Sequence, residues 1–235
     1  MIDKEILRIQ AEYARRETEI DDDRYAPWQP AEMLHLSERR NKAAAGLRSI
    51  GKFPVAGQQC LEIGYGRLGW LADLISWGLR ETDLHGIELD ESRAKAAQLA
   101  LPNADLRIGN AARLPWDDRS FSIVIISTVF SSILGPDLRR SIASEIDRVV
   151  KPGGVVICYD LRRNNPQNRS VRAVTRSELK ELFPNFNSHL KTVTLVPPLA
   201  RAVAPISEFA ARCLALIPLL RTHLLSFLIK RESSE

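Results

Sequence analysis

The sequence predicts an α/β fold in which a doubly wound parallel sheet is covered by helices on both faces. From residue 59 onward, short apolar runs alternate with segments of helical length, which is the pattern of βαβ units. The runs are apolar at nearly every position, as expected for strands buried on both faces. The first run leads directly into a glycine-rich turn and then a helix, an arrangement typical of nucleotide-cofactor sites.

Each element follows from its own pattern. Apolar residues at helical spacing predict a helix within the first 20 residues, and a second is expected over 31–49, after a segment in which Pro27 and Pro30 block helix formation. The expected strands are 60–63, 84–89, 106–108, 121–127, 154–159, 189–196 and 222–230. The expected helices among them are 68–80, 91–100, 137–150 and 176–182, and 197–221 forms an apolar helical insert before the last strand.

Composition bounds the class of protein. The 235 residues are 45% hydrophobic and 26% charged, which is ordinary for one globular domain with a sizeable core. A net charge of +4 is too mild to indicate nucleic acid. The sequence contains no apolar run long enough for a transmembrane helix, and its charged N-terminus lacks a signal-peptide core. Widely spaced cysteines favour a reducing cytoplasm, and no metal site is expected.

The strongest motif is the segment Cys60-Leu61-Glu62-Ile63-Gly64-Tyr65-Gly66, followed by Gly69. Glycines permit a tight turn and let a ligand approach the backbone. The same spacing is a dinucleotide fingerprint, and Glu88 lies where a ribose of either NAD or S-adenosylmethionine (SAM) would bind. Glu62 favours SAM, because a carboxylate here pairs with the methionine ammonium group and would repel a pyrophosphate.

Two later stretches extend this pattern. Gly109-Asn110-Ala111 precedes Leu114-Pro115-Trp116 and Ser120-Phe121-Ser122, and Val149-Val150-Lys151-Pro152-Gly153-Gly154 leads into the fifth strand. Over residues 58–160 the chain therefore resembles the class I SAM-dependent methyltransferases, especially a branch with GDA, LPF, SFD and RVLKPGG motifs. The resemblance implies a seven-stranded, mostly parallel sheet with one antiparallel strand. It also implies an N-terminal helical lid over 1–50 and a methyltransferase domain over 51–235.

The resemblance assigns ten positions to SAM. Glu62 would bind the methionine amino group, Glu88 the ribose hydroxyls and Asn110 the adenine amino group. The other positions are Gly64, Tyr65, Gly66, Leu89, Ala111, Ser127 and Thr128. Asn110 replaces the aspartate of the GDA motif, so weaker or retuned binding is expected. Plainer alternatives are that Glu62 caps a helix, Glu88 is a solvated strand end and Asn110 is a turn residue.

The methyl acceptor is expected over the carboxyl ends of the strands. Candidate substrate-binding residues are Tyr13, Tyr25, Trp28, Phe130, Arg162, Asn164 and Asn165. Candidate catalytic residues are Tyr159, Asp160 and His223, with Asp160 or His223 as a general base. The insert over 197–221 has several possible roles. It covers the pocket of a partly hydrophobic substrate, contacts a dimer partner or a membrane surface, or packs as an extra helix.

The sequence thus predicts a cytoplasmic SAM-dependent methyltransferase, monomeric or homodimeric, acting on an O or N atom of a small molecule. Glycan or secondary-metabolite biosynthesis is its expected context by analogy, and no nucleic-acid partner is expected. Two alternatives stay open. An NAD(P)-binding oxidoreductase would share the fold and the glycine turn, and a non-catalytic SAM-binding scaffold would keep both without the chemistry.

Overall fold

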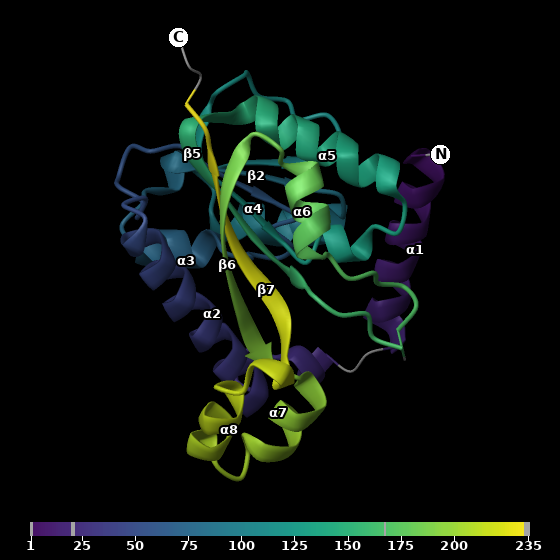
Figure 1. The fold of residues 1–235 in the computed structure, drawn as a ribbon. Coiled ribbons are helices and arrows are strands. Elements are labelled where there is room, and N and C mark those ends of the chain that lie inside the picture. Colours follow the sequence, from purple (N-terminus) through teal and green to yellow (C-terminus); the bar gives the residue numbers. More distant parts are fainter. Residues whose placement is uncertain (1, 20–21, 167, 233–235) are drawn as a thin grey trace.

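A seven-stranded sheet with the order β3-β2-β1-β4-β5-β7-β6 forms the centre of the protein (Figure 1). The structure is a computed structural model and describes residues 2–19, 22–166 and 168–232. The strands are β1 (Cys60–Ile63), β2 (Leu84–Glu88), β3 (Asp105–Ile108), β4 (Phe121–Ser127), β5 (Val150–Leu161), β6 (Phe186–Leu195) and β7 (Arg221–Lys230). β1 to β5 pair in parallel, whereas β7 is antiparallel to both of its neighbours. The predicted α/β class is confirmed, and the sheet is mixed because of β7.

The chain order reverses at β1, since β2 lies on one side of it and β4 on the other. At such a switch point the loops that follow neighbouring strands diverge and leave a crevice beyond their carboxyl ends. The glycine turn after β1 opens into this crevice. The topology therefore places a ligand site at the carboxyl ends of β1, β2 and β4.

Helices cover both faces of the sheet (Figure 1). One face carries α1 (Ile2–Glu19), α5 (Pro136–Val149) and α6 (Arg176–Leu182), and the other carries α2 (Pro30–Ser49), α3 (Leu71–Ser76) and α4 (Glu91–Ala100). Each face of the sheet forms a hydrophobic core with its helices. Because successive side chains of a strand point to opposite faces, Leu61 and Ile63 enter the core beneath α5, and Cys60 enters the core beneath α3. Glu62 therefore points toward the face that α3 covers.

A third, smaller core lies at the lower end of Figure 1. There α7 (Pro197–Val203) and α8 (Glu208–Ala215) connect β6 to β7 and pack on the start of α2. Small residues make this contact, with Ala200 and Ala211 against Ala31 and Leu34. Short 3-10 turns complete the chain: η1 (Asp22–Tyr25), η2 (Glu81–Asp83), η3 (Phe130–Ser132) and η4 (Pro218–Leu220).

Two predicted boundaries were wrong, for local reasons. The helix expected over 68–80 is only α3, because Gly69 (φ 51°) and Gly78 (φ 103°) adopt left-handed conformations that bound it. The segment 151–154, expected as a turn before a strand, lies within β5. There the pairing jumps from Phe121–Val150 to Ile123–Val155, so the extra residues form a bulge.

No helix within residues 2–19, 22–166 and 168–232 is both long enough and apolar enough to cross a membrane.

Candidate active site

The turn between β1 and α3 surrounds the carboxylate of Glu62. The backbone N–H of Trp70 donates to both oxygens of Glu62, at 3.0 and 2.8 Å, and this carboxyl is 1% exposed. Burial raises the pKa of Glu62 from 4.5 to about 8, although the hydrogen bond from Trp70 acts to lower it. The capping role given above as the plainer alternative is thus present. Glu62 lines neither of the two cavities described below, and a cation that reached it would favour its ionised form.

Arg39, which sequence reasoning missed, lies beside this carboxylate. Its guanidinium carbon lies 4.4 Å from the centre of the Trp70 ring, and its Nη2 lies 3.6 Å from a carboxylate oxygen of Asp73. Its Nε is buried and has no hydrogen-bond partner among the described residues. A partly exposed guanidinium with one buried, unused donor is suited to binding a carboxylate. The sequence signal was limited to two adjacent arginines on α2, and nothing local distinguished Arg39 from Arg40.

Glu88 joins the ends of β1 and β2. Its carboxylate accepts a hydrogen bond from Gly66 N at 2.7 Å and another from Asp90 N at 3.0 Å, and the residue is only 4% exposed. Gly66 takes a φ of 58°, which directs its N–H toward this carboxylate. Glu88 lines both of the cavities described next. It is therefore a buried acceptor at the switch point rather than a solvated strand end.

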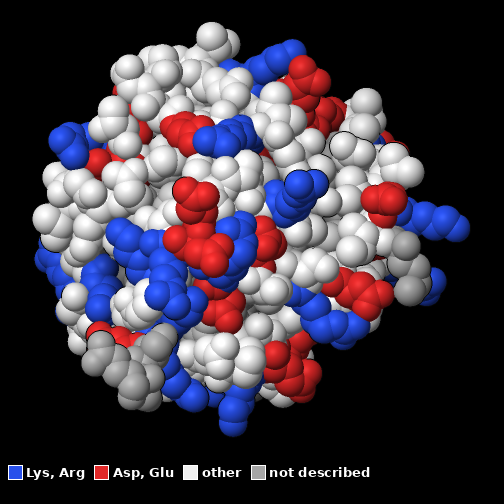
Figure 2. Space-filling model, turned by 90° about the horizontal axis from the view of Figure 1, so that it is seen from above, with Lys and Arg blue, Asp and Glu red and all other residues white. Residues whose placement is uncertain are grey.

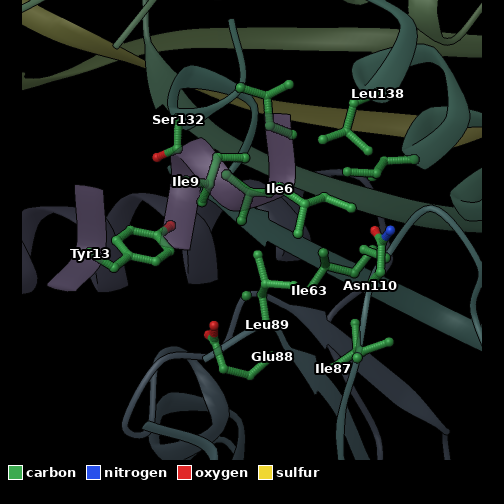
Figure 3. A pocket seen from close by; sticks show the side chains of 16 residues that line it. Ile6, Ile9, Tyr13, Ile63, Ile87, Glu88, Leu89, Asn110, Ser132 and Leu138 are labelled. Carbon is green, nitrogen blue, oxygen red and sulfur yellow. The ribbon is translucent and has the colours of Figure 1, made fainter. Parts of the chain in front are cut away.

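A small cavity of about 60 Å³ lies between α1 and the carboxyl ends of the strands (Figure 3). Ile6, Ile9 and Tyr13 reach into it from α1, and Ile63, Leu89 and Asn110 face them from the sheet side. The lining also includes Gly64, Glu88 and Ala111, so five predicted cofactor-binding positions meet here. Asn110 forms a turn as well, since its Oδ1 accepts from Ala112 N at 2.9 Å.

A large cavity of about 1,150 Å³ adjoins it and extends from the ends of β4 and β5 to α2, α7 and η4. Gly64, Glu88 and Tyr13 line both cavities, which makes the two spaces neighbours. The predicted positions found here are Ser127, Thr128, Tyr25, Tyr159, Asn164, Asn165 and His223. The volume of the large cavity lies slightly above the range for small-molecule sites, whereas that of the small cavity lies well below it.

Backbone strain marks the wall of the large cavity. Thr128 and Thr194 are β-branched residues with φ values of 56° and 68°, a conformation that such side chains rarely adopt. Tyr159 holds both, because its carbonyl accepts from Thr128 N at 2.7 Å and its hydroxyl lies 2.7 Å from Thr194 Oγ1. Strain of this kind persists where the surroundings determine the backbone, which is common at functional sites.

The three candidate catalytic residues differ in accessibility. Tyr159 and His223 line the large cavity and stack in parallel, with ring centres 4.7 Å apart. Burial lowers the pKa of His223 to about 3 and raises that of Tyr159 to about 12, so both are neutral near pH 7. Asp160 lies behind the wall, 1% exposed, where it accepts from Ser131 N and Leu161 N. Burial raises the pKa of Asp160 to about 6.

Several other predicted residues do not line either cavity. Trp28 is 66% exposed, and Phe130 is fully buried with its ring 6.2 Å from that of Phe183. The Arg162 side chain has a buried Nε without a hydrogen-bond partner among the described residues. Tyr65 packs its ring into the core on the α3 face, and its hydroxyl donates to Arg107 O at 3.3 Å. Any contact of Tyr65 with a cofactor would therefore involve its backbone.

Known proteins share both the central sequence and the fold. Residues 61–158 match the family described as "Methyltransferase domain". A phthiotriol/phenolphthiotriol dimycocerosates methyltransferase of Mycobacterium tuberculosis is 34% identical over 136 residues, which are 56% of this chain and 49% of that protein. A probable S-adenosylmethionine-dependent methyltransferase of Mycolicibacterium smegmatis is 33% identical over 136 residues, 54% of this chain and 51% of its own length. The chain thus spans about half the length of these relatives.

Solved structures extend the likeness to most of the chain. A putative sarcosine dimethylglycine methyltransferase from Galdieria sulphuraria superimposes with a TM-score of 0.62 over 82% of this chain and 85% of its own, at 14% identity. At this identity the comparison supports the fold alone. Residues 61–158 are therefore similar in sequence to a methyltransferase domain, and most of the chain shares the fold of a solved methyltransferase.

Proposed function

We propose that this chain transfers a methyl group from SAM to an oxygen or nitrogen atom of a small molecule held in the large cavity. The observation that carries the proposal is the pair of buried carboxylates, Glu62 and Glu88, on either side of the glycine turn. An ammonium group and a ribose diol are complementary to two such acceptors, whereas a pyrophosphate would be repelled by them.

The residues present fit SAM at both of its ends. Glu62 would bind the methionine ammonium group, and Arg39, with its unused Nε, would bind the methionine carboxylate. Glu88 would accept from the ribose, and the adenine would lie against Leu89 near Asn110 and the Ala111 backbone. A nucleoside needs more room than about 60 Å³, so Ile6 and Ile9 have to shift outward with α1 when the adenine binds.

When bound, SAM supplies an activated methyl carbon whose bond to sulfur breaks as the acceptor's lone pair forms the new bond. The protein's own contribution is alignment and exclusion of water. Ser127 ends β4 and Thr128 follows it, beside the glycine turn, so both would border the space between cofactor and acceptor. The neutral imidazole of His223 can accept a hydrogen bond and so orient an acceptor hydroxyl or amine, whose proton then passes to solvent. The proposed context, glycan or secondary-metabolite biosynthesis, comes from likeness to the family branch.

The proposal also assigns peripheral membrane contact to the insert, residues 197–221. Large apolar side chains are exposed on this lobe, among them Ile206 (87%), Phe209 (78%) and Leu219 (72%). Flotation with phosphatidylglycerol vesicles should recover the wild type but less of a Phe209→Ser, Ile206→Ser variant. Equal recovery of both proteins would contradict membrane contact, and loss of a dimer in the variant would assign the lobe to self-association instead.

Calorimetric titration with SAM, S-adenosylhomocysteine and NADH tests the function directly. We expect micromolar binding of the first two and none of NADH. Glu62→Ala and Glu88→Ala should each abolish detectable SAM binding. Glu91→Ala, which removes an exposed α4 carboxylate that pairs with Lys95, should not. Binding of NADH alone would favour the oxidoreductase. SAM binding without release of S-adenosylhomocysteine across an acceptor screen would favour the scaffold.

A further inference from the structure

The lining of the large cavity is strongly cationic. Eight of its residues are arginines, and its only carboxylates among the described residues are Glu32 and Glu88, so the lining carries a formal charge of +6. The whole chain has a net charge of only +4. On the face shown in Figure 2, blue and red side chains lie intermingled. The formal charge of the cavity lining thus exceeds that of the whole chain.

Half of these arginines are already compensated. Arg15 and Arg16 pair with Glu12, Arg93 lies 3.5 Å from Glu17, and Arg39 lies 3.6 Å from Asp73. These four arginines therefore have carboxylate partners within the protein and do not require an anionic ligand. Three of the other arginines that line the cavity form no ion pair with a carboxylate of the described residues.

Arg163, Arg201 and Arg221, here called the arginine cluster, come from three separate segments of the chain. Arg163 follows β5, Arg201 lies on α7 and Arg221 begins β7. None of them forms an ion pair with a carboxylate of the described residues. Arg163 donates to Leu219 O at 3.2 Å, and Arg221 donates to Ala215 O and Thr192 O, so backbone carbonyls hold two of the three in position.

Gathering like charges is unfavourable unless something compensates them. The neighbouring Arg162 shows the effect, since burial and the charges of Arg163, Arg176 and Arg221 lower its pKa. SAM does not supply the missing negative charge, because it carries two positive groups and a single carboxylate, which Arg39 would take. Glu32 compensates part of this charge, since Arg201 acts on its carboxylate, but one carboxylate cannot balance three arginines. An anionic acceptor would supply the rest.

We propose that the methyl acceptor is a small molecule bearing a phosphate group, and that the arginine cluster binds this phosphate. This inference rests on the proposed function, because it assigns the same cavity to an acceptor. A phosphate monoester carries about −1.5 to −2 charges at pH 7, and guanidinium forks bind its oxygens in pairs. A single carboxylate would compensate less of the charge. Thr222 and Asn164, which also line the cavity, add neutral polar groups.

Pyrophosphate is a suitable probe, titrated calorimetrically into the full chain saturated with S-adenosylhomocysteine. We expect binding that Arg201→Gln weakens about tenfold or more, as loss of one charge-assisted contact does. Arg201 makes no hydrogen bond within the described residues, so its replacement leaves no backbone carbonyl without a donor. The matched control is Arg212→Gln on α8, whose guanidinium is half-exposed and pairs with Glu208 outside the cavity, and it should bind like the wild type.

The remaining outcomes separate the explanations. Pyrophosphate binding that is absent, or unchanged in Arg201→Gln, would overturn the phosphate proposal while leaving the proposed function intact, provided that S-adenosylhomocysteine still binds. Equally tight binding of acetate would also overturn it. If S-adenosylhomocysteine itself fails to bind, the proposed function fails first. Stronger retention on phosphatidate than on phosphatidylcholine vesicles, lost in Arg201→Gln, would identify a lipid as the source of the phosphate, and no such retention would identify a soluble ester.

Discussion

Arg39 of α2 stacks on the indole of Trp70, at the start of α3, with the guanidinium carbon 4.4 Å from the ring centre. Trp70 also donates its backbone N–H to Glu62. Trp70 thus positions both the guanidinium of Arg39 and the carboxyl of Glu62. These two groups are complementary to the carboxylate and the ammonium of a zwitterionic amino acid. Five predictions concern this site and its surroundings.

Replacing Arg39 should weaken binding of SAM but not of methylthioadenosine, which lacks the amino-acid group. Arg39→Ala is expected to raise the Kd for SAM about tenfold, or about 1.4 kcal/mol, through loss of a charge-assisted contact. Calorimetry with both ligands measures this. Arg40→Ala is the control, since Arg40 binds Asp73 but does not line the cavity. An equal loss for both ligands would show that Arg39 acts on the fold rather than on the carboxylate.

Glu62 should make the stability of the protein depend on pH in an unusual direction. Burial raises its pKa from 4.5 to about 8, so the folded state holds this proton more tightly than the unfolded state. The associated stability is fully present below pH 4.5 and is lost as the pH rises toward 8. The Tm of Glu62→Gln relative to wild type should therefore increase from pH 5 to pH 8. A constant difference in Tm would show that the carboxyl titrates normally.

Saturating SAM should oppose the loss of stability at higher pH, because its ammonium group favours the ionised form of Glu62. The affinity of the wild type is expected to rise from pH 6 to pH 8, with proton release detectable in buffers of different ionisation enthalpy. The Glu62→Gln variant should bind weakly at every pH. Affinity that falls over this range in the wild type would contradict the pairing.

Glu5 should control how readily α1 leaves the small cavity. Its carboxylate accepts from Leu134 N at 2.6 Å and pairs with Arg8, which in turn donates to Ser132 O. Glu5→Ala is expected to destabilise α1 by about 1 kcal/mol and to speed dissociation of S-adenosylhomocysteine about fivefold in stopped-flow measurements. Glu19→Ala, at the exposed end of the same helix, should have little effect. Unchanged dissociation in the first variant would mean that α1 does not gate the cofactor.

Gly64 should tolerate no side chain. It adopts a φ of 71°, and an added Cβ would lie 2.5 Å from Val129 Cγ2. Gly64→Ala is expected to lose about 1–3 kcal/mol in the free energy of unfolding, measured by urea denaturation, because strain and contact both oppose it. Gly135→Ala provides the control, since Gly135 has a φ of −79° and open space around its Cα. Similar losses in both variants would exclude the steric explanation.

Local patterns were enough to predict much of this protein. The apolar runs that became β1 and β4 were placed at their observed bounds, because strands buried on both faces have an uninterrupted apolar character. The glycines after β1 indicated a turn that only small residues allow, and all three adopt positive φ. These signals lie within a few consecutive residues, so the sequence contains them completely.

Only the tertiary structure decided which distant side chains share the site. Arg39, Arg163, Arg201 and Arg221 are separated by long stretches of chain and resemble any other surface arginine in sequence, yet all of them line one cavity. Conversely, Asp160 was predicted as a general base, yet it is buried behind the cavity wall. Burial and charge environment arise from packing between elements, and packing also sets the pKa of Glu62 and His223. The sequence determined the elements and the glycine turn, whereas the electrostatics of the large cavity arose only when the elements came together.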